Sequence, residues 1–414
     1  MKEEIIRHLD NPKQLESLYR GNKSAFKREF NELYPEVKDS ALAKYWNERI
    51  NFASDEIAWG TRNDLIFVII LSIIAGLIAK LPAFLAINED FFYPRNIGFI
   101  VFPVLTAFFA WKNKFSNVKI LLLAGAMLVG VIFINLLPNL KQSDTLMLSC
   151  AHLIFFLWSV LGIAFVGGTN NNSEKRLGFL KYNGDLVVMT TLIVIAGGIM
   201  SAITIGLFSL IGYEIGDTYM QNVGVFGLSA APVIGTYLTQ TNPQLVGKVS
   251  PVIAKIFSPL VLVMLIVYVG AILYSGKNPY NNREFLLIFN GLLVGVMAII
   301  FFSIAGTPST TKSKAEIGIL LALSIVTILV NGIALSAIIF RISEWGFTPN
   351  RTAVLGSNIL ILVHLLLVSQ KLFKLFLNKV EVNELGKSIS WYLPIYCVWT
   401  IIVTFIFPFL FGFK

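Results

Sequence analysis

Charged residues are scarce in this sequence. Aspartate, glutamate, lysine and arginine make up 14% of its 414 residues, whereas hydrophobic residues make up 56%. The mean hydropathy is +0.73. A water-soluble protein of this size needs more polar surface than such a composition provides, which excludes a soluble fold for most of the chain. The composition therefore indicates an integral membrane protein.

Cysteine and histidine are also rare, with two and three residues respectively. Cys150 and Cys397 lie in separate apolar runs without a CxxC pattern, which argues against a metal site and a structural disulfide. His152 and His364 lack the spacing of a metal motif. Phosphate-binding loops, nucleophile elbows and dinucleotide fingerprints are missing as well. We therefore predict no catalytic residue, no metal and no cofactor, and an enzyme has no positive support.

Long apolar runs are what the sequence has in abundance. Their length of roughly 17 to 27 residues suits α-helices that cross a hydrocarbon core about 30 Å thick. The expected fold class is all-α: a polytopic helical membrane bundle of about eleven spans, preceded by a small soluble helical domain. The domains are 1–62, cytosolic and helical, and 63–414, the transmembrane bundle. The predicted spans are 64–88, 97–111, 118–137, 145–167, 186–212, 221–239, 252–274, 285–306, 315–340, 353–377 and 391–412.

The first 62 residues are polar and contain signals for three short helices. Asn11 followed by Pro12 is a cap with proline at the first helical position. Two further helices each place apolar residues on one face, Phe26, Phe30 and Leu33 in one and Leu42, Tyr45, Trp46 and Ile50 in the other. Such a domain can pack on the bundle as a cap or bind a protein partner, and the sequence leaves both interpretations open.

Lysines and arginines are unequally divided between the two sides of the predicted bundle. If the N-terminus is inside, most of them fall on the cytosolic side, while Arg95, Arg341 and Arg351 are among the few on the other side. The positive-inside rule then predicts a cytosolic N-terminus and an external C-terminus. The net charge of +9 is attributed to this topology, and nucleic acid is not an expected partner.

Ionisable residues inside a span are costly, by at least roughly 2.5 kcal/mol near the centre, and therefore mark candidate sites. Lys80 is the clearest example, about 12 Å before the outer end of the first span. Pro82 frees a backbone carbonyl that could receive the Lys80 ammonium. A structural pair and a role in binding lipid or substrate both stay open.

Acids in the outer connections are the candidate counter-charges. Glu214 and Asp217 stand in YEIGDTY, a connection that contains no base. Their cations would have to come from Lys80, Arg341 or Arg351, unless the loop is simply solvated. No acid lies deep in a predicted span, which argues against a proton-coupled transporter with a buried carboxylate relay. Neutral polar residues in the spans are expected to form helix-to-helix hydrogen bonds; they are Asn135, His152, Asn290, Asn331, Asn358 and His364.

The predicted span 221–239 has an unusual composition. Gly227, Ala231 and Gly235 follow the small-xxx-small spacing of closely packed membrane helices. Pro232 interrupts the backbone hydrogen bonds of the same span. The preceding span repeats the spacing, with Gly198, Ala202 and Gly206. Close packing of the two spans and a discontinuous transporter helix both fit this pattern.

The segment RISEWGFTPNR, residues 341–351, joins two predicted spans. Gly346 is expected to close the first helix in the left-handed conformation, Thr348 to cap the second and Pro349 to begin it. Arg351 then lies at the positive end of a helix dipole, where an acid is favoured. We therefore expect an anion to neutralise it. The candidates are Glu344, Asp217, a lipid phosphate and a substrate anion.

The same segment carries a resemblance to a known family. Arg-Ile followed by aromatic-Gly-x-Thr-x-x-Arg resembles a pattern in the bacterial polytopic membrane proteins grouped as domain of unknown function 4153. APVIGTYL is similar to their proline-containing helix, and LESLYR, FKREFNELYPE and YWNERI resemble a cytosolic extension of some members. The pattern is matched by Arg341, Gly346, Thr348 and Arg351. The resemblance implies a bacterial inner-membrane location and no established reaction.

The polar residues are predicted to gather toward the outer leaflet; they are Lys80, Glu214, Asp217, Arg341, Glu344 and Arg351. The leading hypothesis is a transport- or lipid-handling bundle that uses them as a shared site. One alternative is an accessory or scaffold subunit that recruits a partner through residues 1–62. A weaker alternative is an enzyme acting on lipid-linked material. Membrane lipids are the expected partners, and the sequence leaves the oligomeric state open.

Overall fold

The computed structural model describes residues 2–21, 23–51, 60–140, 142–168, 172–247, 249–275, 283–305 and 313–414. Every regular element in these ranges is helical, so the predicted all-α class is confirmed for them. The chain forms two compact units, residues 1–58 and 59–414. Residues 52–59, which contain the boundary between the units, lie outside the described ranges, as does residue 306 at the end of one predicted span.

The first unit consists of short helices around an aromatic core. They are α1 (Lys2–Arg7), α2 (Pro12–Gly21), α3 (Lys23–Val37) and α4 (Ala41–Asn51). Phe26 and Phe30 are fully buried, with stacked rings whose centroids lie 5.7 Å apart, and Trp46 packs beside them. Tyr45 was expected in this core and is 73% exposed. Adjacent residues of an α-helix point about 100° apart, so Tyr45 and Trp46 do not both face the core. Trp46 is the one that is buried.

Glu16 on α2 pairs with Arg20 of the same helix and with Arg49 of α4. Its carboxylate lies 2.7 Å from Arg20 Nε and 2.7 Å from Arg49 Nη2. The hydrogen bond from Arg20 lowers the pKa of Glu16, the Arg49 charge acts in the same direction, and burial opposes them. A lowered folded pKa contributes stability above the unfolded pKa, and this contribution is lost as the pH falls through the folded value.

We expect Glu16→Gln to cost the first unit about 0.5 to 1 kcal/mol near neutral pH and less at acidic pH, because the cost fades as the pH falls through the folded pKa of Glu16. Amide-exchange protection of residues 2–51 in the full chain measures the effect. Glu32→Gln is the control, because Glu32 is exposed and lies outside these ion pairs. An equal loss for Glu16→Gln at both pH values would contradict the prediction.

The second unit contains helices that are long and apolar enough to cross a membrane, eight of them within the described residues. They are α5 (Arg62–Leu85), α6 (Glu89–Lys112), α7 (Asn117–Leu136), α8 (Asp144–Val166), α9 (Ser173–Leu210), α15 (Lys314–Trp345), α16 (Pro349–Phe376) and Val382–Leu410, which begins with α17 (Val382–Ile401). A multi-pass helical membrane protein is thereby confirmed, whereas the number of eleven spans is not.

Three predicted spans are not among these eight helices. They correspond to α11 (Val225–Thr241), α13 (Val249–Ser275) and α14 (Arg283–Ala305). α11 has 17 residues, and the other two helices contain the shorter apolar stretches Lys255–Gly270 and Phe289–Ala305. α11 is thus shorter than the eight, whereas α13 and α14, with 27 and 23 residues, are comparable to them in length.

Among its described residues the second unit has two large apolar cores and a small one formed by Ala353, Val403 and Phe407. One is shared mainly by α5, α6, α7, α8 and α11 and contains the buried Phe109 and Leu157. The other is shared mainly by α13 to α17 and contains the buried Leu323 and Leu365. Trp158 on α8 packs against both cores, and α17 contacts both α8 and α9. Lys80 on α5 and Arg351 on α16 consequently belong to different helix groups.

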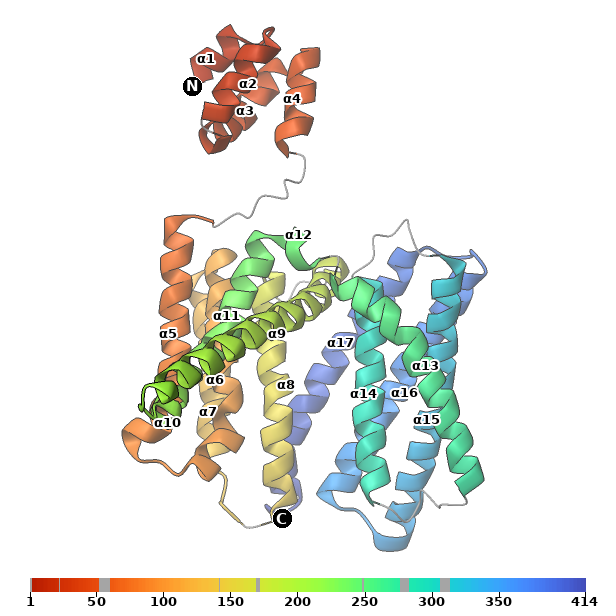
Figure 1. Ribbon diagram of the computed structural model, residues 1–414. Helices are drawn as coiled ribbons and strands as arrows, with labels where there is room; N and C mark the ends of the chain where they lie inside the picture. The colour runs from red at the N-terminus through yellow and green to blue at the C-terminus, as the bar shows by residue number, and fades with distance from the viewer. Residues whose placement is uncertain are drawn as a thin grey trace. The chain divides into compact units, whose positions relative to one another are not determined.

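α9 is much longer than its predicted span. Its 38 residues extend about 57 Å, nearly twice the thickness of a hydrocarbon core. In Figure 1 it runs obliquely across the other helices. Its buried residues all lie between Phe179 and Met189. Gly198 and Gly206, which were expected to pack closely, have no atom within 4 Å of an added Cβ. The prediction of close packing is wrong for both glycines.

α11 packs against α5 and against the earlier part of α9. An added Cβ on Gly235 would lie 2.9 Å from Thr190 Oγ1, and Ala231 is buried, so these two residues do mark a close approach. Gly227 has no atom within 4 Å of an added Cβ. Only the second half of the predicted small-residue stripe is therefore a packing surface.

The chain before α11 is irregular, though not at the predicted place. α10 (Gly216–Tyr219) leads into a π turn (Met220–Gly224), whereas Pro232 lies inside α11 and the helix continues through it. The Val225 amide donates to the carbonyls of Met220 and Asn222. In a regular α-helix it would donate to Gln221, four residues earlier. The π turn thus leaves the Gln221 carbonyl available to a side chain.

Candidate functional site

Lys80 binds the carbonyl that the π turn makes available. Its Nζ donates to Gln221 O at 2.9 Å. The expected acceptor was a carbonyl freed by Pro82 on the same helix, and this detail is wrong because Lys80 turns toward α10 and α11. Within the described ranges no acid pairs with Lys80: Asp217 is exposed, and Glu214 accepts a hydrogen bond from Ser209 at 3.0 Å. Lys80 thus forms a hydrogen bond between α5 and the π turn that precedes α11.

The α15–α16 junction follows the predicted stop and restart. Gly346 ends α15 with φ 73° and ψ −179°, a conformation that a side chain would strain. The φ is positive as expected, but the ψ is extended rather than left-handed helical. Thr348 caps α16, its hydroxyl accepting the Arg351 amide at 3.3 Å, and Pro349 begins the helix.

Arg351 pairs with neither of the two protein acids that were expected, Glu344 and Asp217. Its Nη1 donates to the carbonyls of Trp345 at 2.8 Å and Gly346 at 2.7 Å, and its guanidinium lies 5.7 Å from the Trp345 ring centroid. On the described helices no acid lies within ion-pair distance of Arg351, and Glu344 is exposed. The negative end of the α15 dipole takes the place of the predicted acid.

Arg341 shares this aromatic partner, with its guanidinium 5.6 Å from the Trp345 ring. The junction therefore brings Arg341 and Arg351 together around one indole. It does not bring them to Lys80, whose partner lies on the π turn in the other helix group. The predicted polar residues consequently divide between two separate places.

Arg95 is a site residue that sequence reasoning missed. α6 begins at Glu89, before the predicted start at residue 97, so Arg95 lies within the helix and is only 3% exposed. It donates to Phe91 O at 3.4 Å, Ile134 O at 3.3 Å and Asn139 Oδ1 at 3.3 Å, and it lies 4.1 Å from the Phe91 ring. No acid pairs with it in the part of the chain that the structure describes. The positive charge of Arg95 is therefore compensated only by neutral groups, through hydrogen bonds that are longer than usual.

A cavity of about 440 Å³ opens beside Arg95. Its lining residues are Ile87, Asn88, Asp90, Phe91 and Asn139. Phe91 and Asn139 are also partners of Arg95, so the guanidinium lies directly behind the cavity wall. Asn139 accepts from Arg95 through Oδ1, while its Nδ2 has no hydrogen-bond partner among the described residues. The sequence feature that could have identified this site is the polar pair Arg95–Asn96, which directly precedes an apolar run. Asn135 in the next predicted span is a possible hydrogen-bond partner for Asn96.

The pair Asn96–Asn135 holds α6 and α7 together beside Arg95. Asn96 Nδ2 donates to Asn135 Oδ1 at 2.9 Å, and Asn135 Nδ2 donates to Asn96 Oδ1 at 2.8 Å. Each amide also donates to a carbonyl of its own helix. Both side chains are thus well satisfied inside the bundle, which fixes the register of the two helices around the cavity.

We expect Asn96→Leu to destabilise the second unit by about 1 kcal/mol, because it leaves the Asn135 amide without its interhelical partner. The double variant Asn96→Leu, Asn135→Leu should recover part of this loss, since it removes both polar groups. Thermal unfolding of the full-length protein in one detergent measures the three variants. Additive losses in the double variant would show that the two amides do not act as a pair.

The second helix group holds neutral polar residues in its core. Asn331 Nδ2 donates to Asn358 O at 3.2 Å, and His364 Nδ1 lies 3.1 Å from the Tyr396 hydroxyl. Asn331, Asn358 and His364 are fully buried. These contacts join α15 to α16 and α16 to α17, as predicted for Asn331 and His364, whereas the buried Asn358 side chain has no hydrogen-bond partner among the described residues. His152 differs, because its Nδ1 contacts a carbonyl of its own helix.

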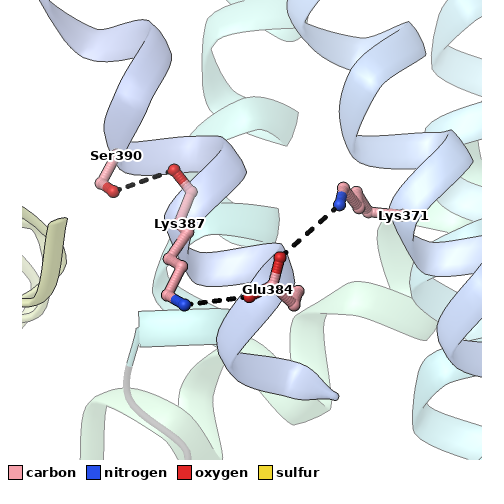
Figure 2. Close-up of polar contacts among 4 residues, drawn as sticks. All are labelled: Lys371, Glu384, Lys387 and Ser390. Atoms are coloured by element: carbon pink, nitrogen blue, oxygen red, sulfur yellow. Dashed lines mark hydrogen bonds and ion pairs between the residues drawn. The ribbon is translucent and has the colours of Figure 1, made fainter. Parts of the chain in front are cut away.

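Glu384 lies between two lysines at the α16–α17 junction (Figure 2). It accepts from Lys387 at 2.9 Å and lies 3.8 Å from Lys371, while Ser390 donates to the Lys387 carbonyl at 3.1 Å. The charged side chains are 30 to 52% exposed, so solvent screens and weakens both ion pairs. This cluster ties two helix ends together and partly neutralises two of the lysines used to predict the topology.

No group of three or more His, Cys, Asp or Glu side chains that could hold a metal ion occurs within the described ranges. Comparisons of the chain with protein-family models, with curated proteins and with solved structures give no match. The resemblance to the domain of unknown function 4153 therefore stays a prediction. The function has to be inferred from the geometry of the chain itself.

Proposed function

We propose that the protein is a lipid-handling protein of the bacterial inner membrane that binds a phospholipid headgroup in the cavity beside Arg95. The observation that carries the proposal is the buried Arg95 guanidinium, which contacts two residues of the cavity wall and pairs with no described acid. An ionisable residue inside a membrane span is expensive and by default indicates a functional site. A bound anion would offset that expense.

In this proposal the protein has about eleven spans, with the N-terminus inside and the C-terminus outside. The first span then runs outward, so the α5–α6 junction lies at the outer leaflet. In Figure 1 this junction, the end of α7 and the α15–α16 junction lie at the same end of the second unit. Arg95 lies about 9 Å along the helix axis from Glu89, the first residue of α6. The cavity that opens between them is thus at the depth of phospholipid headgroups.

A phosphate in the cavity would meet a polarised donor. Arg95 donates to Asn139 Oδ1, which draws electron density from the amide and strengthens Asn139 Nδ2 as a donor. The positive charge of Arg95 adds a longer-range attraction, which solvent around the exposed Asn139 partly screens. Lys80 and Arg351, by contrast, bind backbone carbonyls and support the fold.

The test is saturable binding of a short-chain phosphatidylglycerol to the full-length protein in detergent. Arg95→Gln is expected to weaken binding about ten-fold, since it removes a charged hydrogen-bond donor, and Arg95→Lys should retain part of the affinity. Asn139→Leu should weaken binding without touching the buried arginine. Lys379→Gln, an exposed turn residue, is the control. Absence of saturable binding to the unaltered protein, or unchanged binding in both Arg95→Gln and Asn139→Leu, would refute the proposal.

A scaffold function is the second candidate, because residues 1–58 form a compact unit with a core of their own. In that case the first unit would recruit a protein partner and the bundle would serve as its membrane anchor. Pull-down with the full chain and with a chain lacking residues 1–60 separates the two candidates. A scaffold loses its partner on truncation, whereas headgroup binding at the α6–α7 cavity is retained.

A further inference from the structure

The cavity beside Arg95 is lined by one group that favours a bound cation and by another that favours a bound anion. On the start of α6, the Asp90 side chain lines it with a carboxylate. At the end of α7, Asn139 lines it with an amide that Arg95 polarises. Asp90 is exposed, and neither Arg95 nor any other described base lies within ion-pair distance of it. The cavity therefore offers one place for a cation and another for an anion.

A ligand with only one sign of charge fits this cavity poorly. A purely anionic headgroup would meet the Asp90 carboxylate, and a purely cationic group would meet the field of Arg95. The start of α6 does not remove the conflict, because the amides of Asp90 and Phe91 already donate to Asn88 Oδ1, at 2.7 and 3.3 Å. The helix end is thus not free to bind the anion by itself.

The type of cation follows from the aromatic content of the cavity. Quaternary ammonium groups are usually held by aromatic cages. Here Phe91 is the aromatic residue of the lining, and its ring already lies 4.1 Å from the Arg95 guanidinium. The carboxylate oxygens of Asp90 remain as acceptors for N–H donors, because Asn88 Oδ1 already accepts two backbone amides. A primary ammonium satisfies them, whereas a choline group does not.

We infer that the ligand is a zwitterionic phospholipid with a primary ammonium, in the chemical class of phosphoethanolamine. Its ammonium binds Asp90, and its phosphate binds Asn139 Nδ2 in front of Arg95. This inference rests on the proposed lipid-binding function and adds the headgroup class to it.

The experiment compares three soluble lipids with identical short acyl chains and phosphoethanolamine, phosphocholine or phosphoglycerol headgroups, each titrated into the full-length protein in detergent. The phosphoethanolamine lipid is expected to bind about five-fold more tightly than the other two, a modest factor because Asp90 is exposed. Asp90→Asn should abolish this preference and leave phosphoglycerol binding intact or stronger. Glu89→Gln, one residue earlier and not part of the cavity lining, should leave the preference unchanged.

The outcomes separate the inference from the function on which it rests. Equal binding of the three lipids, or an Asp90→Asn variant that keeps the preference, overturns the headgroup assignment while the lipid-binding function stands. Absence of saturable binding for all three overturns the proposed function itself. Glycerophosphoethanolamine, which has the same headgroup and no acyl chains, is the last arm. If it binds as tightly as the lipid, the ligand is a soluble headgroup and the lipid assignment is wrong.

Discussion

Replacing Gly76 by alanine is expected to destabilise the second unit by about 2 to 3 kcal/mol. Gly76 lies where α5 packs against α11, and an added Cβ would stand 2.1 Å from Phe226 Cδ1 and 2.5 Å from Phe226 Cε1. The phenyl ring therefore occupies the volume that the methyl group needs. In an exposed helix the same substitution would stabilise by up to about 1 kcal/mol, so the contact with Phe226 decides the sign.

Thermal unfolding of the full-length protein in one detergent checks this expectation. Gly125→Ala is the matched control, because Gly125 also lies inside a helix and has no atom within 4 Å of an added Cβ. It should be as stable as the original protein or slightly more stable. The double variant Gly76→Ala, Phe226→Ala should be no less stable than Phe226→Ala alone. A Gly76→Ala protein that unfolds at the original temperature would contradict the packing of α5 on α11.

Replacing Arg351 by methionine is expected to cost about 1 to 2 kcal/mol. The substitution keeps an unbranched apolar stem but removes the charged hydrogen bonds to the carbonyls of Trp345 and Gly346, together with the contact to the Trp345 ring. The two carbonyls end α15 and have lost their helical donors, so they depend on a side chain for compensation. The partial exposure of Arg351 keeps the expected loss below that of a fully buried pair.

Two further variants identify the cause of the loss. Arg351→Lys keeps the charge but replaces the planar guanidinium by a point charge, and it should recover less than half of the stability. Lys379→Met removes an exposed charge in a turn and should change nothing. Full recovery in Arg351→Lys would show that charge alone matters. An unchanged unfolding temperature in Arg351→Met would contradict the carbonyls as its stabilising partners.

Local chemistry made much of the fold predictable. The long apolar runs specified membrane helices, because length and hydropathy are properties of each segment by itself. Thr348 and Pro349 specified the start of α16 for the same reason, since a cap acts within one turn. The aromatic core of the first unit followed from helical spacing at Phe26 and Phe30.

The candidate site was less predictable, because its partners come from other helices. Small-residue spacing at Gly198 and Gly206 looks the same as at Gly235, yet only Gly235 meets a neighbouring helix. Lys80 was recognised as exceptional, but its acceptor depends on a π turn far away in the chain. Arg95 was assigned to a loop because the apolar run begins after it, although α6 extends further and buries its side chain.

The sequence by itself determined that the chain is a helical membrane protein, where most helices begin and end, and which cations need an explanation. Those properties depend on the hydropathy of each segment and on interactions within a few residues along the chain. Packing against other helices does not change them. Only the tertiary structure decided what neutralises each cation: a π-turn carbonyl for Lys80, the end of α15 for Arg351, and for Arg95 neutral groups beside a cavity. Charge compensation depends on distances between helices, and the order of residues along the chain does not encode these distances locally.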